Sequence, residues 1–186
     1  MNTKLVKHII LIIALIIIIN VTSNYYFHRF DLTTERKYSI SENTKKILKS
    51  INDIVYFKIY LYGDLPIEYK TLQKEIGYML NELRAYSQYI EYEFIDPTTL
   101  ENEEYKNMLQ KELYKKGITP IPHRNYKGNK MEETWIFPGI IASYQSKESV
   151  IQLINKTLMH NSNQVMQEVV EKLEYHLMNG IRSLTK

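Results

Sequence analysis

The chain has 186 residues and a net charge of +3, from 24 basic and 21 acidic residues, and it contains no cysteine. The lack of cysteine excludes disulfides, thiolate metal sites and cysteine nucleophiles. Basic and acidic residues are well mixed, whereas a nucleic-acid-binding surface needs clustered Lys and Arg, so we expect no nucleic-acid partner. The residues after the first thirty suffice for one domain with its own core.

The first thirty residues predict a membrane anchor. Ile9–Ile19 is an unbroken apolar run that follows Lys4 and Lys7. Alone it would span about 17 Å, which is too short for a hydrocarbon core of about 30 Å. Extended over residues 5–27 it reaches about 34 Å and ends in the aromatic residues Tyr25–Phe27, which suit a membrane interface. We therefore expect a transmembrane helix near residues 5–27.

The flanking charges predict the orientation of this helix. Lys4 and Lys7 lie on its short side, so the positive-inside rule places the N-terminus in the cytoplasm and the remaining domain in the periplasm. The protein would then be a single-pass component of the inner (cytoplasmic) membrane. A cleaved signal peptide is the main alternative, because Val21–Ser23 offers small residues at a suitable cleavage position. A buried core helix is disfavoured, because every side of the segment is apolar.

Three regions follow from the residue pattern. Residues 1–30 hold the cytoplasmic start and the anchor, residues 31–53 a polar connector and an amphipathic helix, and residues 54–186 the periplasmic α/β domain. The sequence Ser39–Glu42 has the form of a capping box, which predicts the start of the amphipathic helix. Residues 52–53, Asn and Asp, would end that helix.

The first half of the α/β domain predicts a right-handed βαβ unit. Residues 54–62 alternate between two largely apolar faces, as in an interior strand. Apolar residues at helical spacing follow up to Ser87, and residues 90–95 form the next strand. These two strands should be parallel, because a helix connects them. Residues 102–116 predict another helix, which Gly117 would end.

The second half predicts four strands and a long helix. Residues 118–126 and 133–137 would form a hairpin, residues 140–144 and 150–154 would flank another turn, and residues 163–184 follow a helical period. The order β-α-β-α-β-β-α predicts an α/β fold, specifically a thioredoxin-like three-layer domain with a mixed sheet. A flavodoxin-like fold is the alternative, which the hairpin disfavours because a doubly wound sheet would be all parallel.

The sequence contains no catalytic or cofactor motif. The six glycines are scattered and form no phosphate-binding loop, and no GxSxG, HExxH or Walker pattern occurs. The five histidines lie far apart, and no pair has the spacing of metal ligands. We therefore expect a protein that is not an enzyme and that binds no metal or cofactor.

Two places could bind a partner or a ligand. Asp64 and Asp96 each follow a predicted strand, at the edge where α/β proteins often bind ligands. The alternative for Asp96 is turn chemistry, because Asp before Pro is common in turns. The segment Trp135–Ile141 contains the single Trp and no charge. It is either a core strand or a partner-binding surface that includes Trp135 and Phe137.

Seven segments together resemble one protein family. The segments are Arg29–Thr33, Lys37–Ser41, Tyr60–Pro66, Leu83–Ser87, Glu93–Pro97, Phe137–Gly139 and Leu173–Arg182. In combination they are similar to the N-terminal half of the gliding-motility ABC-transporter auxiliary proteins known as GldG. The resemblance covers almost the whole chain. Members of that family continue into a second α/β domain, so we expect this chain, which stops at Lys186, to be a fragment, a split gene or a short paralogue.

The resemblance implies a function in the cell envelope. It implies an uncleaved anchor, a periplasmic domain and association with an ABC-type ATPase and its permease in a complex linked to gliding. We therefore predict a membrane-anchored, non-catalytic auxiliary subunit of such a transporter, with the permease, the ATPase and the lipid bilayer as partners. The alternative is a periplasmic module that binds a small solute near Asp64, Asp96 and residues 120–130. An enzyme is the third hypothesis, which the missing motifs disfavour.

Overall fold

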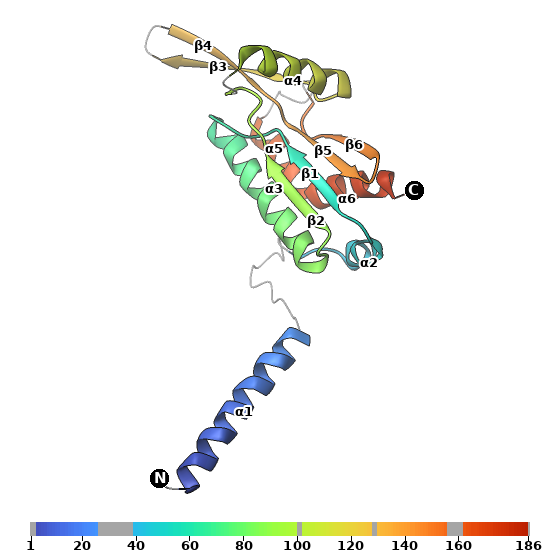
Figure 1. The fold of residues 1–186 in the computed structure, drawn as a ribbon. Coiled ribbons are helices and arrows are strands. Elements are labelled where there is room, and N and C mark those ends of the chain that lie inside the picture. Colours follow the sequence, from blue (N-terminus) through green and yellow to red (C-terminus); the bar gives the residue numbers. More distant parts are fainter. Residues whose placement is uncertain (1–2, 26–38, 100–101, 128–129, 156–161, 186) are drawn as a thin grey trace. The chain divides into compact units, whose positions relative to one another are not determined.

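Two compact units make up the chain (Figure 1). The first unit is Met1–Lys37 and the second is Tyr38–Lys186. The structure, a computed structural model, describes residues 3–25, 39–99, 102–127, 130–155 and 162–185. The described part of the first unit is a single helix, and all the described strands belong to the second unit.

Helix α1 (Thr3–Tyr25) is the described part of the first unit. Its apolar residues occupy every side of the helix, because the run Ile9–Ile19 is longer than three helical turns. The Ile, Leu and Val side chains from Ile9 to Val21 are 48% to 69% exposed. This helix therefore presents an apolar surface around its whole circumference.

The prediction of a transmembrane helix is wrong. Over the described residues, no helix combines the length and the apolar content that crossing a membrane requires. The physical reason lies in the short apolar run, which begins just after Lys7 and meets Asn20 at its other end. Tyr26 and Phe27, which were expected at the membrane interface, lie outside the described residues. The location at the inner membrane, with the domain in the periplasm, stays a prediction.

The second unit is a mixed α/β domain built on a four-stranded sheet. Its strands are β1 (Val55–Ile59), β2 (Ile90–Phe94), β5 (Gly139–Tyr144) and β6 (Lys147–Gln152). They lie in the order β2-β1-β5-β6, where β1 and β2 are parallel and β5 is antiparallel to both β1 and β6. The predicted α/β class and mixed sheet are confirmed, and the all-parallel flavodoxin-like alternative is wrong.

The predicted hairpin forms, but it lies outside this sheet. Strands β3 (Ile121–Lys127) and β4 (Lys130–Ile136) are antiparallel, and among the described strands they pair only with each other. Pro122 has no backbone N–H to donate, which suits a strand outside a main sheet. The mixed strand directions of the main sheet come from β5 and β6 instead. The prediction of a mixed sheet was therefore right, but the hairpin on which it rested is not part of that sheet.

The main core lies on one face of the sheet. The helices that contribute to it are α2 (Glu42–Ser50), α3 (Ile67–Tyr86), α5 (Ser162–Glu171) and α6 (Leu173–Leu184). Phe57 of β1, Ile76 of α3 and Leu177 of α6 are each 0% exposed within this core. Such complete burial of large apolar side chains is the main source of the stability of the unit.

A second, smaller core lies on the opposite face, to which alternate residues of each strand point. Helix α4 (Glu103–Lys116) contributes to it. Its buried members are Tyr60, Leu113, Ile118, Phe137 and Ile141. This small core holds α4 and the end of the hairpin against the sheet, and the candidate site is built on it.

Two predicted helix boundaries need correction. The helix expected over residues 163–184 is divided at Lys172, where the backbone (φ −96°, ψ 6°) departs from helical values, into α5 and α6. The N-cap of α2 is Ser41 rather than Ser39, which the predicted capping box places there, because the Ser41 Oγ accepts the Thr44 N–H at 3.2 Å. Glu42, which the box would direct backwards, pairs with Lys45 instead.

Glu174 of α6 joins the start of α2 to the C-terminal part of the chain. Its Oε1 accepts the Ser41 N–H at 3.0 Å and the Thr44 hydroxyl at 2.6 Å. Thr44 is only 4% exposed, so few waters could replace this acceptor. A carboxylate suits this place, because the first N–H groups of a helix lack helical partners and the helix dipole favours negative charge there.

We predict that Glu174→Ala lowers the free energy of unfolding by about 1–3 kcal/mol, because it leaves the buried Thr44 hydroxyl without its charged acceptor. Urea denaturation followed by circular dichroism measures the change. The matched control is Glu171→Ala, which removes a carboxylate bonded to Gln167 on an exposed helical surface and should change stability by about 0.5 kcal/mol or less. Equal effects of the two substitutions would contradict the assigned role of Glu174.

Candidate functional site

Helix α4 forms one wall of the candidate site, and local sequence sets both of its ends. Asn102 caps the first turn, where its side chain accepts two backbone N–H groups at 2.8 and 3.1 Å. Gly117 ends the helix with φ at 105°, a left-handed conformation that favours glycine. The Ile118 N–H then donates to the Leu113 carbonyl at 2.9 Å. This helix end directs Ile118 into the small core.

The floor of the site comes from the turn between β4 and β5. Each backbone carbonyl of that turn accepts a hydrogen bond. The Phe137 carbonyl accepts the Gly139 N–H at 2.9 Å, the Pro138 carbonyl accepts the Leu153 N–H at 2.9 Å, and the Gly139 carbonyl accepts the Tyr60 N–H at 3.0 Å. The turn is therefore bonded to both β1 and the end of β6, which makes it rigid although it is not regular secondary structure.

The segment after α4 passes close to this turn. A Cβ atom at Gly139 would lie 2.7 Å from the Ile118 side chain, so only glycine leaves room for that approach. The side-chain amide of Gln152 then holds the next residue: its Oε1 accepts the Thr119 N–H at 3.1 Å and its Nε2 donates to the Thr119 carbonyl at 3.2 Å. These contacts position Pro120 and the start of β3.

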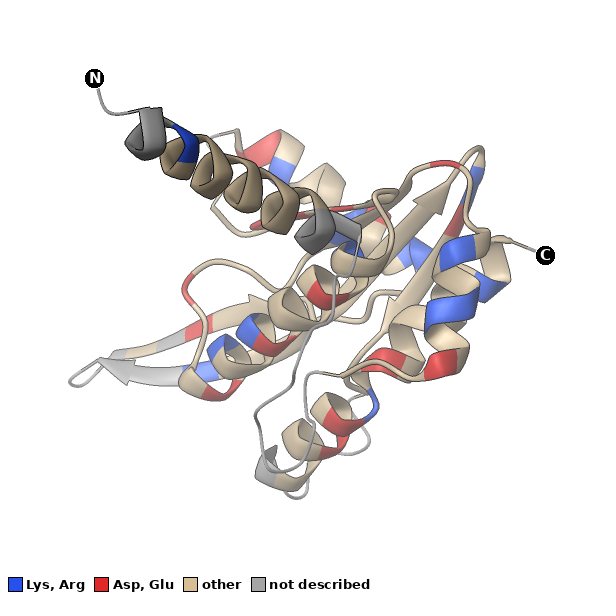
Figure 2. Cartoon of the chain, turned by 90° about the horizontal axis from the view of Figure 1, so that it is seen from below, with Lys and Arg blue, Asp and Glu red and all other residues tan. Residues whose placement is uncertain are grey.

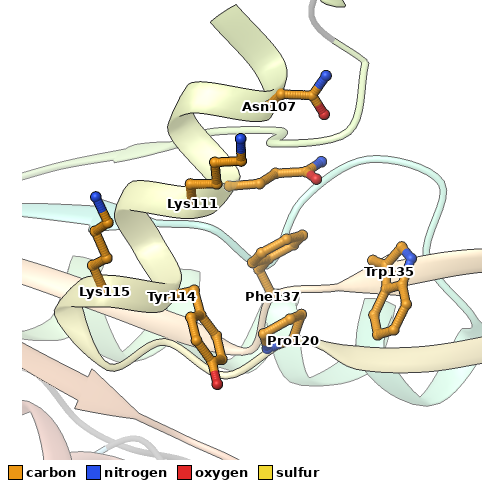
Figure 3. A pocket seen from close by; sticks show the side chains of 8 residues that line it. Asn107, Lys111, Tyr114, Lys115, Pro120, Trp135 and Phe137 are labelled. Carbon is orange, nitrogen blue, oxygen red and sulfur yellow. The ribbon is translucent and has the colours of Figure 1, made fainter. Parts of the chain in front are cut away.

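A groove of about 380 Å³ lies between α4 and the base of the β3–β4 hairpin. In Figure 3 the Phe137 ring occupies its middle, with Trp135 on one side and helix α4 on the other. The lining residues are Asn107, Gln110, Lys111, Tyr114, Lys115, Pro120, Trp135 and Phe137. Most of the lining surface is apolar, and most of the polar side chains that line it come from α4.

Two of the four residues proposed from the sequence, Trp135 and Phe137, meet in this groove. The segment that contains them is neither wholly core nor wholly surface. Ile136 is 2% and Phe137 is 3% exposed, whereas Trp135 is 45% exposed. Side chains alternate along a strand, so Ile136 enters the main core while its neighbour Trp135 points to the opposite side.

Sequence reasoning missed the contribution of α4 to the groove. Its lining residues recur at positions 107, 110–111 and 114–115, which is the spacing of one helical stripe. Tyr114 is 64% exposed. A large aromatic residue on such a stripe is the signal that could have identified this side of α4 as part of the site. The sequence does not show that this stripe faces Trp135, because the contact depends on how the turn after β4 is placed.

The charges of α4 fall into two groups. Lys116 is paired, with Nζ at 2.6 Å from Glu148 Oε2 and 3.1 Å from Glu112 Oε1, and the bond to Glu148 raises the pKa of Lys116. Lys111 and Lys115 have no carboxylate partner among the described residues. Elsewhere in the second unit both signs of charge occur along the helices (Figure 2). The groove therefore combines an apolar floor with two positive charges that no carboxylate of the described residues neutralises.

Tyr60 lies in the small core that supports the groove. Burial raises its pKa to about 12. The cause is the removal of water, which penalises the charged phenolate more than the neutral phenol. Tyr60 is therefore protonated at neutral pH and serves as a packing residue beneath the groove floor.

Asp96 and Asp64, the other two proposed residues, lie outside the groove. Asp96 stabilises its own turn: Oδ1 accepts the Thr98 N–H at 2.8 Å and the Thr98 hydroxyl at 2.6 Å, and Oδ2 accepts the Thr99 hydroxyl at 2.6 Å. Asp64 is 94% exposed, with Lys70 Nζ at 3.7 Å. Both residues follow strands of the sheet, as expected, but Asp96 has the turn role that was its alternative.

The Asp96 turn is packed against its neighbours. Gln110, which lines the groove, donates from Nε2 to the Pro97 carbonyl at 2.8 Å and so joins the turn to α4. On the other side, Gly63 has φ at 108°, and a Cβ atom there would overlap the Asp96 carboxylate. Within the described residues, no group of His, Asp or Glu is arranged to hold a metal ion.

Comparison with known proteins identifies one match. Residues 34–143, more than half of the chain, match the model of a family described as a domain of unknown function, DUF7088. No curated protein and no solved structure matches the chain. The matched residues include α2 to α4, the β3–β4 hairpin and every residue that lines the groove.

We predict that Gly63→Ala lowers the free energy of unfolding by about 2–4 kcal/mol, because it combines a left-handed backbone with overlap of the Asp96 carboxylate. Gly117→Ala is the matched control: φ is 105°, but no atom lies within 4 Å of the added Cβ, so only the backbone term of about 1–2 kcal/mol applies. Chemical denaturation measures both. When Asp96 is also replaced by Ala, the loss of unfolding free energy caused by Gly63→Ala should be no larger than that caused by Gly117→Ala. If the loss is the same with and without Asp96, the proposed overlap is contradicted.

Proposed function

We propose that this chain, which belongs to the DUF7088 family, is a non-catalytic auxiliary subunit of an ABC-type transporter complex associated with gliding motility. The sequence resemblance to the GldG proteins supports the choice of complex. The observation that carries the proposal is structural: helix α1 exposes apolar side chains on all of its sides and belongs to a different compact unit from the α/β domain.

The chemistry of α1 defines the kind of partner that it needs. A helix that is apolar on one face requires one neighbour, whereas a helix that is apolar on every side is stable only when apolar groups surround it. A partner subunit with exposed apolar helices, such as a permease, offers such surroundings. An isolated soluble enzyme would have no use for this surface, since a contiguous exposed apolar surface promotes aggregation.

The second candidate is a module that binds a small solute. The groove beside α4 favours it, because a volume of about 380 Å³ is at the lower end of the range that ligand pockets occupy. Its position overlaps the one that the sequence suggested at Pro120, but neither Asp64 nor Asp96 lines it. The auxiliary-subunit function remains the stronger proposal, because solute binding does not account for α1.

We predict that the double substitution Ile13→Asp and Ile17→Asp abolishes co-purification of the permease and the ATPase with this chain from gently solubilised membranes. Both side chains are more than half exposed and lie one helical turn apart, so two charges would disrupt any apolar contact along that side. The measurement is mass spectrometry of the material retained by an affinity tag on the chain, expressed at its natural level.

The control for this experiment is the double substitution Ile54→Asp and Ile67→Asp, which places the same charges at exposed apolar positions of the α/β domain. It should leave co-purification intact. Circular dichroism melting of both variants checks that the domain stays folded. Recovery of the unsubstituted chain as a lone monomer, or equal loss with both pairs of substitutions, would refute the proposed assembly.

A further inference from the structure

Helix α4 and strand β4 carry a large share of the exposed apolar side chains of the second unit. Of the eleven large apolar side chains that are exposed in its described residues, five lie on α4 or β4. They are Tyr105, Met108, Tyr114, Met131 and Trp135, of which Tyr114 and Trp135 line the groove. Aromatic residues and methionine are the types that protein interfaces favour, whereas scattered exposed apolar residues carry no such meaning.

Packing and hydrogen bonds hold the floor of the groove in place. Phe137 is 3% exposed and belongs to the small core, and the carbonyls of its turn are bonded to β1 and to the end of β6. Gln110 is held by the Pro97 carbonyl. A binding surface that is already ordered loses little conformational entropy on association, which favours specific binding.

The positive charge of the groove favours a partner with negative charge. Lys111 and Lys115 lie one turn apart on α4, and no acidic residue lines the groove. The nearby carboxylate of Glu112 is engaged by Lys116. A partner that placed carboxylates beside these two ammonium groups would gain attraction without separating an existing ion pair of either lysine.

The exposure of the groove walls favours a chain segment over a small solute as the bound partner. Trp135 is 45% and Tyr114 is 64% exposed, so the walls of the groove are in contact with water. Pockets for small molecules enclose most of the surface of their ligand, which walls as open as these do not achieve. An extended segment needs no enclosure, because it can lay one or two apolar side chains on the floor and continue in either direction.

We propose that the groove between α4 and the hairpin binds an extended acidic peptide segment of a partner protein, in which an apolar side chain rests on Phe137 and flanking carboxylates pair with Lys111 and Lys115. The Asn107 and Gln110 side chains provide polar groups beside the backbone of that segment. This site belongs to the α/β domain and does not involve α1, so its failure would leave the proposed transporter association untouched, and the reverse also holds.

The single tryptophan makes the site directly observable. Trp135 is the only Trp of the chain and lines the groove, so its emission reports occupancy. The full chain in mild detergent is titrated with a blocked peptide that alternates Asp with Phe and Leu. Two further peptides keep the apolar residues and replace Asp by Asn or by Lys. We expect a saturable spectral change with the acidic peptide, weaker change with the neutral one and none with the basic one.

Charge reversal in the protein is the matched test. Lys111→Glu with Lys115→Glu should weaken the acidic peptide roughly tenfold or more, since two attractive contacts become repulsive. Lys46→Glu with Lys49→Glu makes the same charge change on the exposed side of α2 and should leave affinity unchanged. Trp135→Ala should also weaken binding, measured by the anisotropy of a labelled peptide, and melting curves confirm that each variant is folded.

Four results would overturn this proposal. The first three are the absence of saturable binding at millimolar peptide, equal affinity for the acidic and basic peptides, and equal effects of the two charge reversals. The fourth is binding of phenylacetate as tight as binding of the peptide, which would identify a small-solute site. Binding of phosphatidylglycerol vesicles without peptide binding, abolished by Lys111→Glu with Lys115→Glu, would assign the groove to an anionic lipid surface instead and would equally refute a peptide site.

Discussion

The turn at Phe137–Gly139 is the constraint on which the arrangement of the α/β domain depends. Its three carbonyls accept hydrogen bonds from the N–H groups of Gly139 itself, of Leu153 just after β6 and of Tyr60 just after β1, so the chain passes from the hairpin into β5 at one defined place. The missing side chain of Gly139 lets Ile118 pass beside it, which brings the end of α4 to the same place. The small core and the groove above it both follow from this close approach, because each is built from residues on the two sides of the turn.

Local patterns were sufficient to predict most of the elements. Helix α4 was predicted with its end at Gly117, and β1, β2 and the parallel connection between them followed from period and length. The errors arose where distant residues decide the outcome. Ser41 caps α2 because Glu174, which lies 133 residues away, fixes its N–H. The hairpin leaves the main sheet because β5 takes the place beside β1, and no local pattern records that choice.

The candidate site could be predicted only on one of its walls. An uncharged segment with a lone tryptophan drew attention to Trp135 and Phe137. Asp96 drew attention for its position after a strand, but its carboxylate oxygens accept hydrogen bonds from Thr98 and Thr99. The sequence alone does not distinguish this turn role from ligand binding. The opposite wall on α4 consists of ordinary helical surface residues, and these acquire meaning only when the fold sets them across from Trp135.

The two apolar surfaces of this protein differ in a way that assigns them to different kinds of partner. Helix α1 is apolar around its circumference, so its contacts depend little on the side from which a partner approaches. Such a helix suits a surrounding apolar environment. The groove has an apolar floor edged by Lys111 and Lys115, so under the peptide proposal its contacts depend on the order of apolar and acidic groups in the partner. Under the two proposals, affinity comes from the first surface and selectivity from the second. Two modest contacts on one chain reinforce each other when both can be made at once.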